Sequence, residues 1–368
     1  MRADVLLDVT PATGGHGLRG IGRYVRGVVG SLEEWPPERR ERVWAVGRAG
    51  EILDRFGARG IPSRSLGLRP LDLGLILGPM AAGGAVRKSG ARIFHATDPH
   101  RPWTLSRVRQ LVTVYDLIPL REAAMLASWK PHQRFVYHAY LRQIRTAEAI
   151  VAISGTTARD VAERLGVSED RIAVVSPVVE APSHFGRVPQ EDGPTFLLVG
   201  ALDSHKRPEL AIEALARFRA RQHEGRLRLI GPSDERQRAG VLGHARRLGV
   251  LDWVTLEGRI SDAELDAAYA SATALLSTSS VEGFGLPAVE AALRGVPVIS
   301  VDIPSARETV AAAATLVQPD AEAIAEAMAK PRAPSREARD RLRVRYCRRS
   351  AAEALWAAYE PLLSRSRV

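Results

Sequence analysis

Short apolar runs alternate with amphipathic stretches along most of the chain. In the first half, β-rich runs lie at residues 5–7, 43–46, 93–95, 111–115 and 149–153. Apolar residues with helical spacing lie between or after them at 21–32, 131–146 and 154–165. Strands separated by helices favour right-handed crossovers and a parallel sheet. We therefore predict an N-terminal α/β domain over residues 1–180.

A proline-rich passage without periodicity follows, and we interpret residues 181–194 as an interdomain linker. The alternation then restarts, with β-rich runs at 196–199, 226–230, 254–256, 274–276 and 298–300 and helical spacing at 208–220, 241–248, 262–270 and 287–293. A second α/β domain is predicted over 195–345. With two such units in tandem, the carboxyl ends of the strands are expected to face a ligand in a central cleft.

The C-terminal residues 346–368 predict a further helix with an apolar stripe of Leu355, Trp356, Tyr359 and Leu362. This stripe must pack on one of the two domains. We expect the helix to cross back to the first domain, with packing on the second as the alternative.

The bulk composition limits compartment and partners. Cys347 is the only cysteine, so an internal disulfide is excluded and a reducing cytoplasm is expected. The first eight residues are too few and too acidic for a signal peptide, and no apolar run approaches ~20 residues. The net charge of +10 favours anionic partners, or else reflects an arginine-rich solvated surface. No zinc spacing or RNA-binding aromatic signature accompanies it, so nucleic acid is not expected as a partner.

One loop and the helix after it combine backbone amides with two carboxylates. The loop holds Glu282, Gly283, Phe284, Gly285 and Leu286, and Pro287 then suits the first turn of a helix. Free amides of residues 284–286 at a helix N-terminus are a ready site for phosphate or sugar oxygens. Glu290, one turn into the helix, can accept hydrogen bonds from a vicinal diol such as a ribose. The alternative is a helix cap with a solvated Glu290.

The stretch 277–308 resembles the donor-site signature of the retaining glycosyltransferases of family 4, which have the GT-B fold of two Rossmann-like domains. Glu282 and Glu290 stand eight positions apart, as that family's E-x7-E motif requires. The resemblance implies that residues 283–286 and Glu290 bind a nucleotide-sugar donor and that Glu282 acts on its sugar.

The segment 199–206 resembles the family's strand and loop around the donor diphosphate. It implies that Gly200 approaches the donor and that Lys206 stabilises charge on the leaving diphosphate. His205 stands where the family usually has an arginine, and Arg207 lies one place late. We therefore expect Arg207 to supply part of the missing charge. An exposed basic helix start is the alternative for Lys206 and Arg207.

Three further segments resemble the family. Arg259 and Ile260 lie where the nucleotide base would be contacted through the backbone. Gly20 and Gly22 belong to a glycine-rich segment, 13–24, that resembles a phosphate-facing loop of the first domain. Asp116 matches a strand end that usually reads His-Asp-Leu, and it is assigned to the catalytic set. Tyr115 replaces that histidine, either as an altered sugar contact or as a core aromatic.

The resemblance implies transfer of a hexose-type sugar from GDP-mannose or a UDP-sugar to a hydroxyl acceptor, with retention at the anomeric carbon. The acceptor would be a glycan, a lipid-linked sugar or a small molecule. No covalent nucleophile is evident, and no Asp-x-Asp motif is present, so we expect neither a metal nor another cofactor. The basic and aromatic segment 129–140 is either a peripheral membrane contact at the inner membrane face or a surface helix with inward aromatics.

Two rival interpretations remain open at this point. A nucleotide-binding oxidoreductase would need a full dinucleotide fingerprint, and no acidic ribose partner lies cleanly ~20 residues beyond Gly15, Gly17 and Gly20. A relative that binds a nucleotide sugar but has altered or lost transferase activity is favoured by the departures at Tyr115 and His205.

Overall fold

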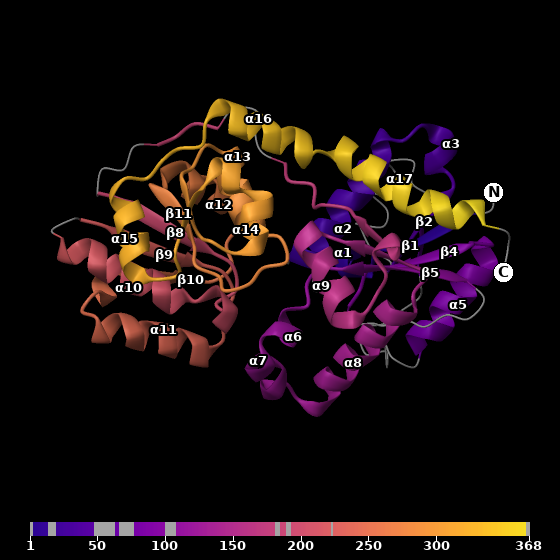
Figure 1. Cartoon of the computed structure of the whole chain (residues 1–368), viewed down its shortest axis with the longest axis horizontal. Coiled ribbons are helices and arrows are strands. Elements are labelled where there is room, and N and C mark those ends of the chain that lie inside the picture. Colours follow the sequence, from indigo (N-terminus) through magenta and orange to yellow (C-terminus); the bar gives the residue numbers. More distant parts are fainter. Residues whose placement is uncertain are drawn as a thin grey trace. The chain divides into compact units, whose positions relative to one another are not determined.

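The structure is a computed structural model that describes residues 3–13, 20–47, 63–65, 77–99, 108–180, 185–188, 193–221 and 224–365. Its contacts divide the chain into two compact units (Figure 1). Unit 1 combines Met1–Val178 with Tyr346–Val368, and unit 2 is Val179–Arg345. The expected linker is described only at 185–188 and 193–194, and 185–188 packs on unit 2, where the Val188 amide donates to the Ala270 carbonyl (3.0 Å).

Unit 1 is built on a seven-stranded parallel sheet with the order β3-β2-β1-β4-β5-β6-β7. Its strands are β1 (Val5–Asp8), β2 (Val43–Gly47), β3 (Ser63–Ser65), β4 (Ile93–Ala96), β5 (Arg109–Val114), β6 (Ala149–Ala152) and β7 (Ile172–Val174). Every residue of β1, β4 and β5 is buried, as expected for the centre of a sheet covered on both faces. The predicted parallel α/β architecture is confirmed for this unit.

The helices of unit 1 are α1 (Thr10–Thr13), α2 (Gly20–Ser31), α3 (Pro37–Arg40), α5 (Leu77–Ser89), α6 (Ile118–Arg121), α7 (Ala123–Ser128), α8 (Pro131–Thr146), α9 (Gly155–Leu165) and α17 (Arg348–Ser364). Local chemistry sets the ends of α9 as the sequence predicts. The Ser154 side chain accepts from the Thr157 amide (3.0 Å), and Gly166 ends the helix in the left-handed region at φ 66°.

Helix α17 packs on the core of unit 1 (Figure 1, yellow). The Trp35 indole donates to the Ala352 carbonyl (2.9 Å), and the Tyr359 hydroxyl is hydrogen-bonded to Nδ1 of His95 (2.8 Å). His95 Nε2 is bonded to the Thr113 hydroxyl (2.8 Å), and burial lowers the pKa of His95 to about 3. His95 is therefore a neutral core residue that ties α17 to β4 and β5.

Unit 2 carries a six-stranded parallel sheet with the order β10-β9-β8-β11-β12-β13. Its strands are β8 (Thr195–Val199), β9 (Arg226–Ile230), β10 (Val254–Glu257), β11 (Ala274–Ser277), β12 (Val298–Val301) and β13 (Thr315–Val317). The chain builds outward from β8 to β10 and then returns to place β11 on the other side of β8. This reversal makes the carboxyl ends of β8 and β11 the topological switch point, where ligands of open α/β sheets bind.

The helices of unit 2 are α10 (Pro208–Ala220), α11 (Glu235–Arg247), α12 (Asp262–Ser271), α13 (Leu286–Leu293), α14 (Pro304–Thr309), α15 (Ala321–Ala329) and α16 (Arg336–Arg345). Two of these helices begin at a different residue from the one predicted. Helix α13 begins at Leu286, so Pro287 is its second residue. Helix α11 begins six residues before the predicted 241, because a capping box between Asp234 and Gln237 starts it ahead of its apolar residues.

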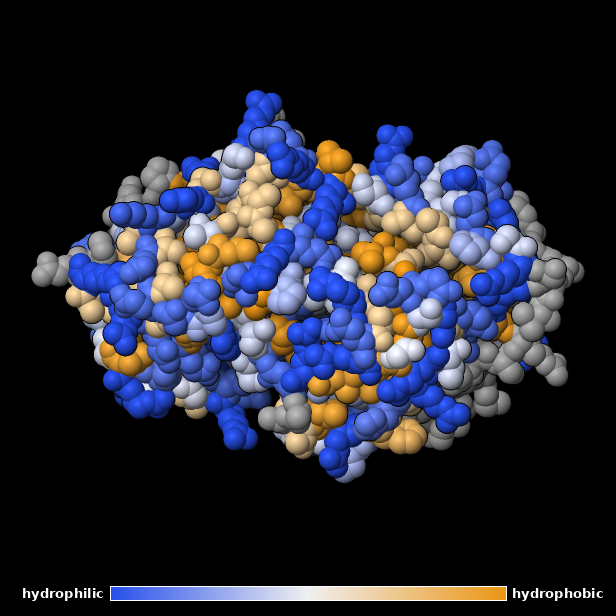
Figure 2. Space-filling model, in the orientation of Figure 1, coloured by the Kyte–Doolittle hydropathy of each residue, from blue (hydrophilic) through white to orange (hydrophobic). Residues whose placement is uncertain are grey.

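On the face drawn in Figure 2, hydrophilic side chains separate the apolar residues into small groups. Within the described ranges, no helix combines the length and apolarity needed to cross a bilayer.

Candidate functional site

Two oppositely charged side chains meet at the switch point of unit 2. Lys206 ends the 3₁₀ helix η3 (Ser204–Lys206), which follows β8, and Glu282 lies in the loop that follows β11. The Lys206 ammonium forms an ion pair with Oε1 of Glu282. Only 16% and 13% of these side chains are exposed. The fold thus brings together two of the four predicted catalytic residues, which are 76 positions apart in the chain.

The Glu282 carboxylate is bonded on one side only. Ser279 Oγ donates to Oε1 (2.7 Å), the oxygen that also receives Lys206, whereas Oε2 has no partner among the described residues. Burial favours the neutral acid, but the charge and hydrogen bond of Lys206, the Ser279 hydroxyl and the nearby His205 hold the pKa of Glu282 below its usual range. Lys206, Ser279, Glu282 and Gly285 line one small pocket, so an ionised carboxylate borders it.

Hydrogen bonds join the two loops that carry this pair. Thr278 Oγ1 donates to the Lys206 carbonyl (2.6 Å), and Nε of Arg207 donates to the Thr278 carbonyl (3.0 Å). Arg207 adopts a left-handed backbone at φ 47°, a strained choice for a residue with a side chain. The Nε side of its guanidinium thus joins the loops, whereas Nη2 is buried without a hydrogen-bond partner among the described residues. The predicted role of Arg207 in meeting the charge of the diphosphate stays a prediction.

His205 is buried beside the pair. Its carbonyl accepts from the Ser280 amide (2.8 Å), and its Nδ1 is buried without a hydrogen-bond partner in the described part of the chain. Gly200 follows β8, and a side-chain carbon built on it would contact the Lys206 side chain. The predicted Gly200, His205 and Lys206 therefore do gather around one loop.

The start of α13 lies beside the two loops that carry Lys206 and Glu282 and lines the same pocket. Gly285 caps the helix in the left-handed region at φ 87°, and its carbonyl accepts from the Ala288 amide (3.0 Å). Gly283 and Phe284 are buried, and the Phe284 carbonyl accepts from the Thr309 hydroxyl (3.1 Å). The chain therefore turns sharply between Glu282 and Leu286, which keeps the helix start beside the carboxylate.

Glu290 is buried rather than solvated, with 5% of its surface exposed. Its Oε2 accepts from the Tyr269 hydroxyl (3.2 Å), and the Tyr269 ring lies under the guanidinium of Arg294. The alternative of a solvated Glu290 at a plain helix cap is wrong, because a buried carboxylate needs polar partners.

Arg259 and Ile260 lie in the loop between β10 and α12, where Arg259 is exposed and Ile260 is half-buried. Gly20 and Gly22 occupy the first turn of α2, and residues 14–19 of the glycine-rich segment lie outside the described residues. The contacts of the described residues do not assign a ligand to any of these four positions.

Asp116 and Tyr115 follow β5 of unit 1. Asp116 Oδ1 accepts from the Ile118 amide (3.1 Å) at the start of α6. The Tyr115 hydroxyl donates to the Thr97 carbonyl (2.8 Å), and its ring packs edge-on against Tyr24. Tyr115 thus adopts the core role that its residue type allowed.

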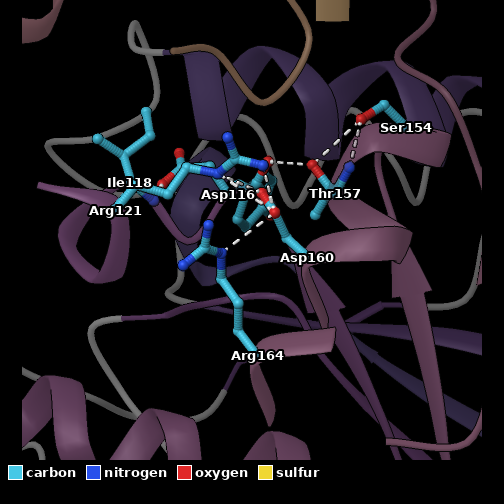
Figure 3. A network of polar contacts seen from close by, with 8 residues as sticks. Asp116, Ile118, Arg121, Ser154, Thr157, Asp160 and Arg164 are labelled. Atoms are coloured by element: carbon cyan, nitrogen blue, oxygen red, sulfur yellow. Dashed lines mark hydrogen bonds and ion pairs between the residues drawn. The ribbon is translucent and has the colours of Figure 1, made fainter. Parts of the chain in front are cut away.

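A network behind Asp116 anchors this strand end (Figure 3). Arg121 of α6 donates to both carboxylate oxygens of Asp160 on α9. Nε of Arg164, also on α9, donates to Oδ1 of Asp160 (3.3 Å). Thr157 Oγ1 donates to the Tyr115 carbonyl (3.2 Å). Helix α6, whose first residue binds Asp116, is therefore paired with α9, and α9 also bonds the carbonyl of the residue before Asp116.

Several buried polar residues in both units were not identified as candidates from the sequence. Ser279, Thr278 and Tyr269 belong to unit 2, and the run Ser277 to Ser280 before Glu282 was the available signal. In unit 1, Asp8 ends β1 next to β4. Burial and the negative charge of Asp98 raise the pKa of Asp8 to about 7, against hydrogen bonds from Thr10 and Thr97.

Comparisons with known proteins cover both units. The family model described as Glycosyltransferase Family 4 matches residues 14–181, and that of Glycosyl transferases group 1 matches residues 181–343. A D-inositol 3-phosphate glycosyltransferase of Acidothermus cellulolyticus is 31% identical over 51% of this chain and 46% of its own length. A 2-deoxystreptamine glucosyltransferase of Streptomyces kanamyceticus is 28% identical over 45% of this chain and 46% of its own length. The matches thus span about half the length of these curated relatives.

Solved structures share the fold at low identity. Sucrose-phosphate synthase of Thermosynechococcus elongatus aligns with a TM-score of 0.74 and 21% identity over 99% of this chain and 100% of that chain. Anabaena HepE in complex with UDP-glucose aligns with a TM-score of 0.62 and 15% identity over 97% of this chain and 94% of the HepE chain. The fold is GT-B. Because the two family models together account for residues 14–343, the chain belongs to the glycosyltransferases of family 4 and group 1.

Proposed function

We propose that the chain transfers a hexose-type sugar from a nucleoside diphosphate sugar to a hydroxyl acceptor, with retention at the anomeric carbon. The observation that carries the proposal is the ion pair of Lys206 and Glu282 at the switch point of unit 2, where Glu282 lines the pocket and its Oε2 has no partner among the described residues. A cation beside a carboxylate suits a ligand that combines phosphates with hydroxyl groups.

Each group has a role in this proposal. Lys206 stabilises the negative charge that builds on the leaving diphosphate. Glu282 accepts hydrogen bonds from sugar hydroxyls, and Glu290, held by Tyr269, accepts from the ribose. The leaving phosphate assists deprotonation of the acceptor, so the protein mainly positions the reactants. UDP-glucose and GDP-mannose are the first donors to test, since HepE, which shares the fold, was solved with UDP-glucose.

We also propose that transfer needs no metal, because Lys206 and the start of α13 would meet the diphosphate charge. For the acceptor, the named relatives suggest a polyol or a glycan. Helix α8 exposes Phe135 (66%) beside exposed Lys130 and Arg134, which supports contact with an anionic membrane. Sedimentation with phosphatidylglycerol vesicles tests that contact.

A relative that binds the donor without transferring it is the second candidate. The observation in its favour is Tyr115, whose hydroxyl is used by the Thr97 carbonyl and whose ring is buried. Donor binding without turnover on any acceptor would support this candidate.

Calorimetric titration with UDP-glucose and GDP-mannose, with and without EDTA, tests the proposal. We expect one donor to bind the wild type equally well in both conditions. Lys206→Ala and Glu290→Ala should each weaken binding at least tenfold, about 1.4 kcal/mol. Arg336→Ala, an exposed position on α16, is the matched control. Wild-type affinity in both site variants would contradict the proposed function.

A further inference from the structure

Ser279 makes a contact that the proposed chemistry leaves unused. It lies between β11 and Glu282, and 3% of its surface is exposed. Its hydroxyl donates to Oε1 of Glu282 (2.7 Å), and Lys206 is bonded to that same oxygen. Both donors therefore gather on one carboxylate oxygen.

We propose that Ser279 is a positioning residue of the donor site, which holds the Glu282 carboxylate so that Lys206 and Ser279 share Oε1 and Oε2 is kept for the sugar. The proposal deepens the proposed function and rests on it. It adds the residue that decides which oxygen of Glu282 meets the ligand.

The physical need for such a residue follows from the symmetry of a carboxylate. Its terminal torsion is broad and roughly twofold, so an ammonium group alone can bind either oxygen. A second donor fixed on one side removes that equivalence. The carboxylate then presents one oxygen to the protein and the other to the pocket.

The residues on either side hold Ser279 in place independently of Glu282. Thr278 Oγ1 donates to the Lys206 carbonyl (2.6 Å), and the Ser280 amide donates to the His205 carbonyl (2.8 Å). Ser279 is thus held between two residues that are bonded to the 205–207 turn. Its hydroxyl is fixed by the same turn that carries Lys206.

The charged and polar groups that act on Glu282 are Lys206, His205 and Ser279. Burial disfavours the charged carboxylate, and the three groups oppose it. Loss of the Ser279 hydroxyl removes one of the stabilising contacts, so the pKa of Glu282 should rise. Because the charged form is the one that accepts from the sugar, the acid limb of donor binding should then move to higher pH.

The experiment compares Ser279→Ala, Ser279→Thr, Ser271→Ala and Glu282→Gln in the full chain. Binding of UDP-glucose, GDP-mannose, UDP and GDP is titrated by calorimetry from pH 4 to 8. Ser279→Ala should weaken the bound nucleotide sugar about fivefold, leave the matching diphosphate within about twofold, and shift the acid limb upward. Ser279→Thr keeps a hydroxyl and should restore binding. The Ser271 hydroxyl donates to the Ala267 and Ala268 carbonyls of its own helix, so Ser271→Ala should behave as the wild type.

The outcomes separate the two proposals. If Glu282→Gln loses sugar-dependent affinity while Ser279→Ala matches Ser271→Ala, the positioning role is overturned and the proposed function stands. Equal losses of sugar and diphosphate binding in Ser279→Ala and Ser279→Thr, with a lowered Tm, indicate a purely structural role and also overturn it. If neither nucleotide sugar binds the wild type, or if Glu282→Gln and Lys206→Ala bind as the wild type does, the proposed function fails.

Discussion

At the residue scale, Asp8 is a carboxyl group whose pKa its surroundings raise. It ends β1 in unit 1 with 1% of its surface exposed, and it accepts from the Thr10 amide (2.9 Å) and hydroxyl (2.6 Å). Burial and the charge of Asp98 nevertheless raise its pKa from 3.8 to about 7. Folding therefore favours the neutral acid, which must be deprotonated at some cost as the pH rises.

The sign of the effect on stability follows from the two pKa values. Well below pH 3.8 Asp8 is protonated in both states, whereas between 3.8 and about 7 it is ionised mainly in the unfolded chain. The free energy of unfolding should fall over that window, by up to about 4 kcal/mol, and then level off. Asp8→Asn keeps an oxygen for Thr10 and should flatten the dependence. Urea unfolding from pH 4 to 8 measures it, and an unchanged slope in the variant would exclude Asp8 as the cause.

Whether a site residue could be predicted from the sequence depends on how far along the chain its contacts lie. Lys206, Glu282 and Glu290 are recognisable because each has a charge and a fixed spacing from a helix or strand. Tyr269 gains its role from Glu290, which lies 21 residues away on another helix. Ser279 gains its role from a loop whose conformation depends on hydrogen bonds to the distant residues Lys206 and His205. The burial of Tyr115 and the pKa of Asp8 depend on neighbouring strands. No local pattern contains that information.

At the element scale, the start of α13 depends on one backbone conformation. Gly285 has φ 87°, and the space where a side-chain carbon would sit is open. A substitution there is opposed by backbone strain and not by a clash. Gly166 at the end of α9 has φ 66° and equally open space, but it lies in unit 1.

These two glycines form a matched pair. Gly285→Ala and Gly166→Ala should each lower the free energy of unfolding by about 1–2 kcal/mol, the cost of a left-handed residue with a side chain. Only Gly285→Ala should also weaken binding of the nucleotide sugar, because it moves the helix start next to Glu282. Thermal unfolding and calorimetry on both variants measure this. Equal donor affinity in the two would show that the turn at Gly285 serves the fold alone.

Elements with strong patterns are predicted closely from the sequence. The bounds of α8, α10 and β9 agree with the prediction to the residue. The short strands β3, β7 and β13 were not predicted, because three residues carry too little periodicity. Strands of this length depend on pairing with a neighbour, which only the assembled sheet supplies.

At the scale of the whole molecule, unit 1 is discontinuous in sequence. Its last helix, α17, follows all of unit 2 and buries Leu355, Tyr359 and Leu362. Arg109 on β5 donates to the Leu362 carbonyl (2.9 Å), so strand and helix 253 positions apart are joined. The amphipathic stripe was visible in the sequence. We expected this stripe to pack on the first domain, and it does, although the stripe alone did not exclude the second, because both domains offered apolar surfaces.

A buried charge on α17 should therefore loosen unit 1 selectively. Leu355→Asp replaces a side chain with no exposed surface, and an unpaired buried charge is strongly destabilising. Hydrogen exchange should accelerate in β1, β4 and β5, while β8, β9 and β11 keep wild-type rates. Glu353→Ala is the control, because Glu353 is exposed and lies two residues before Leu355 on the same helix. Faster exchange confined to unit 2 would contradict the assignment of the helix.

The same discontinuity affects how the chain is synthesised. Domains generally fold as units while the ribosome elongates the chain, the N-terminal one first. Here all of Val179–Arg345 is translated before the final segment of unit 1 exists. Unit 2, with its switch-point site, can be complete at a time when the sheet of unit 1 still lacks the helix that covers it. The unit that begins second along the gene is thus the first that can finish folding, and the earlier one must wait in a partly uncovered state.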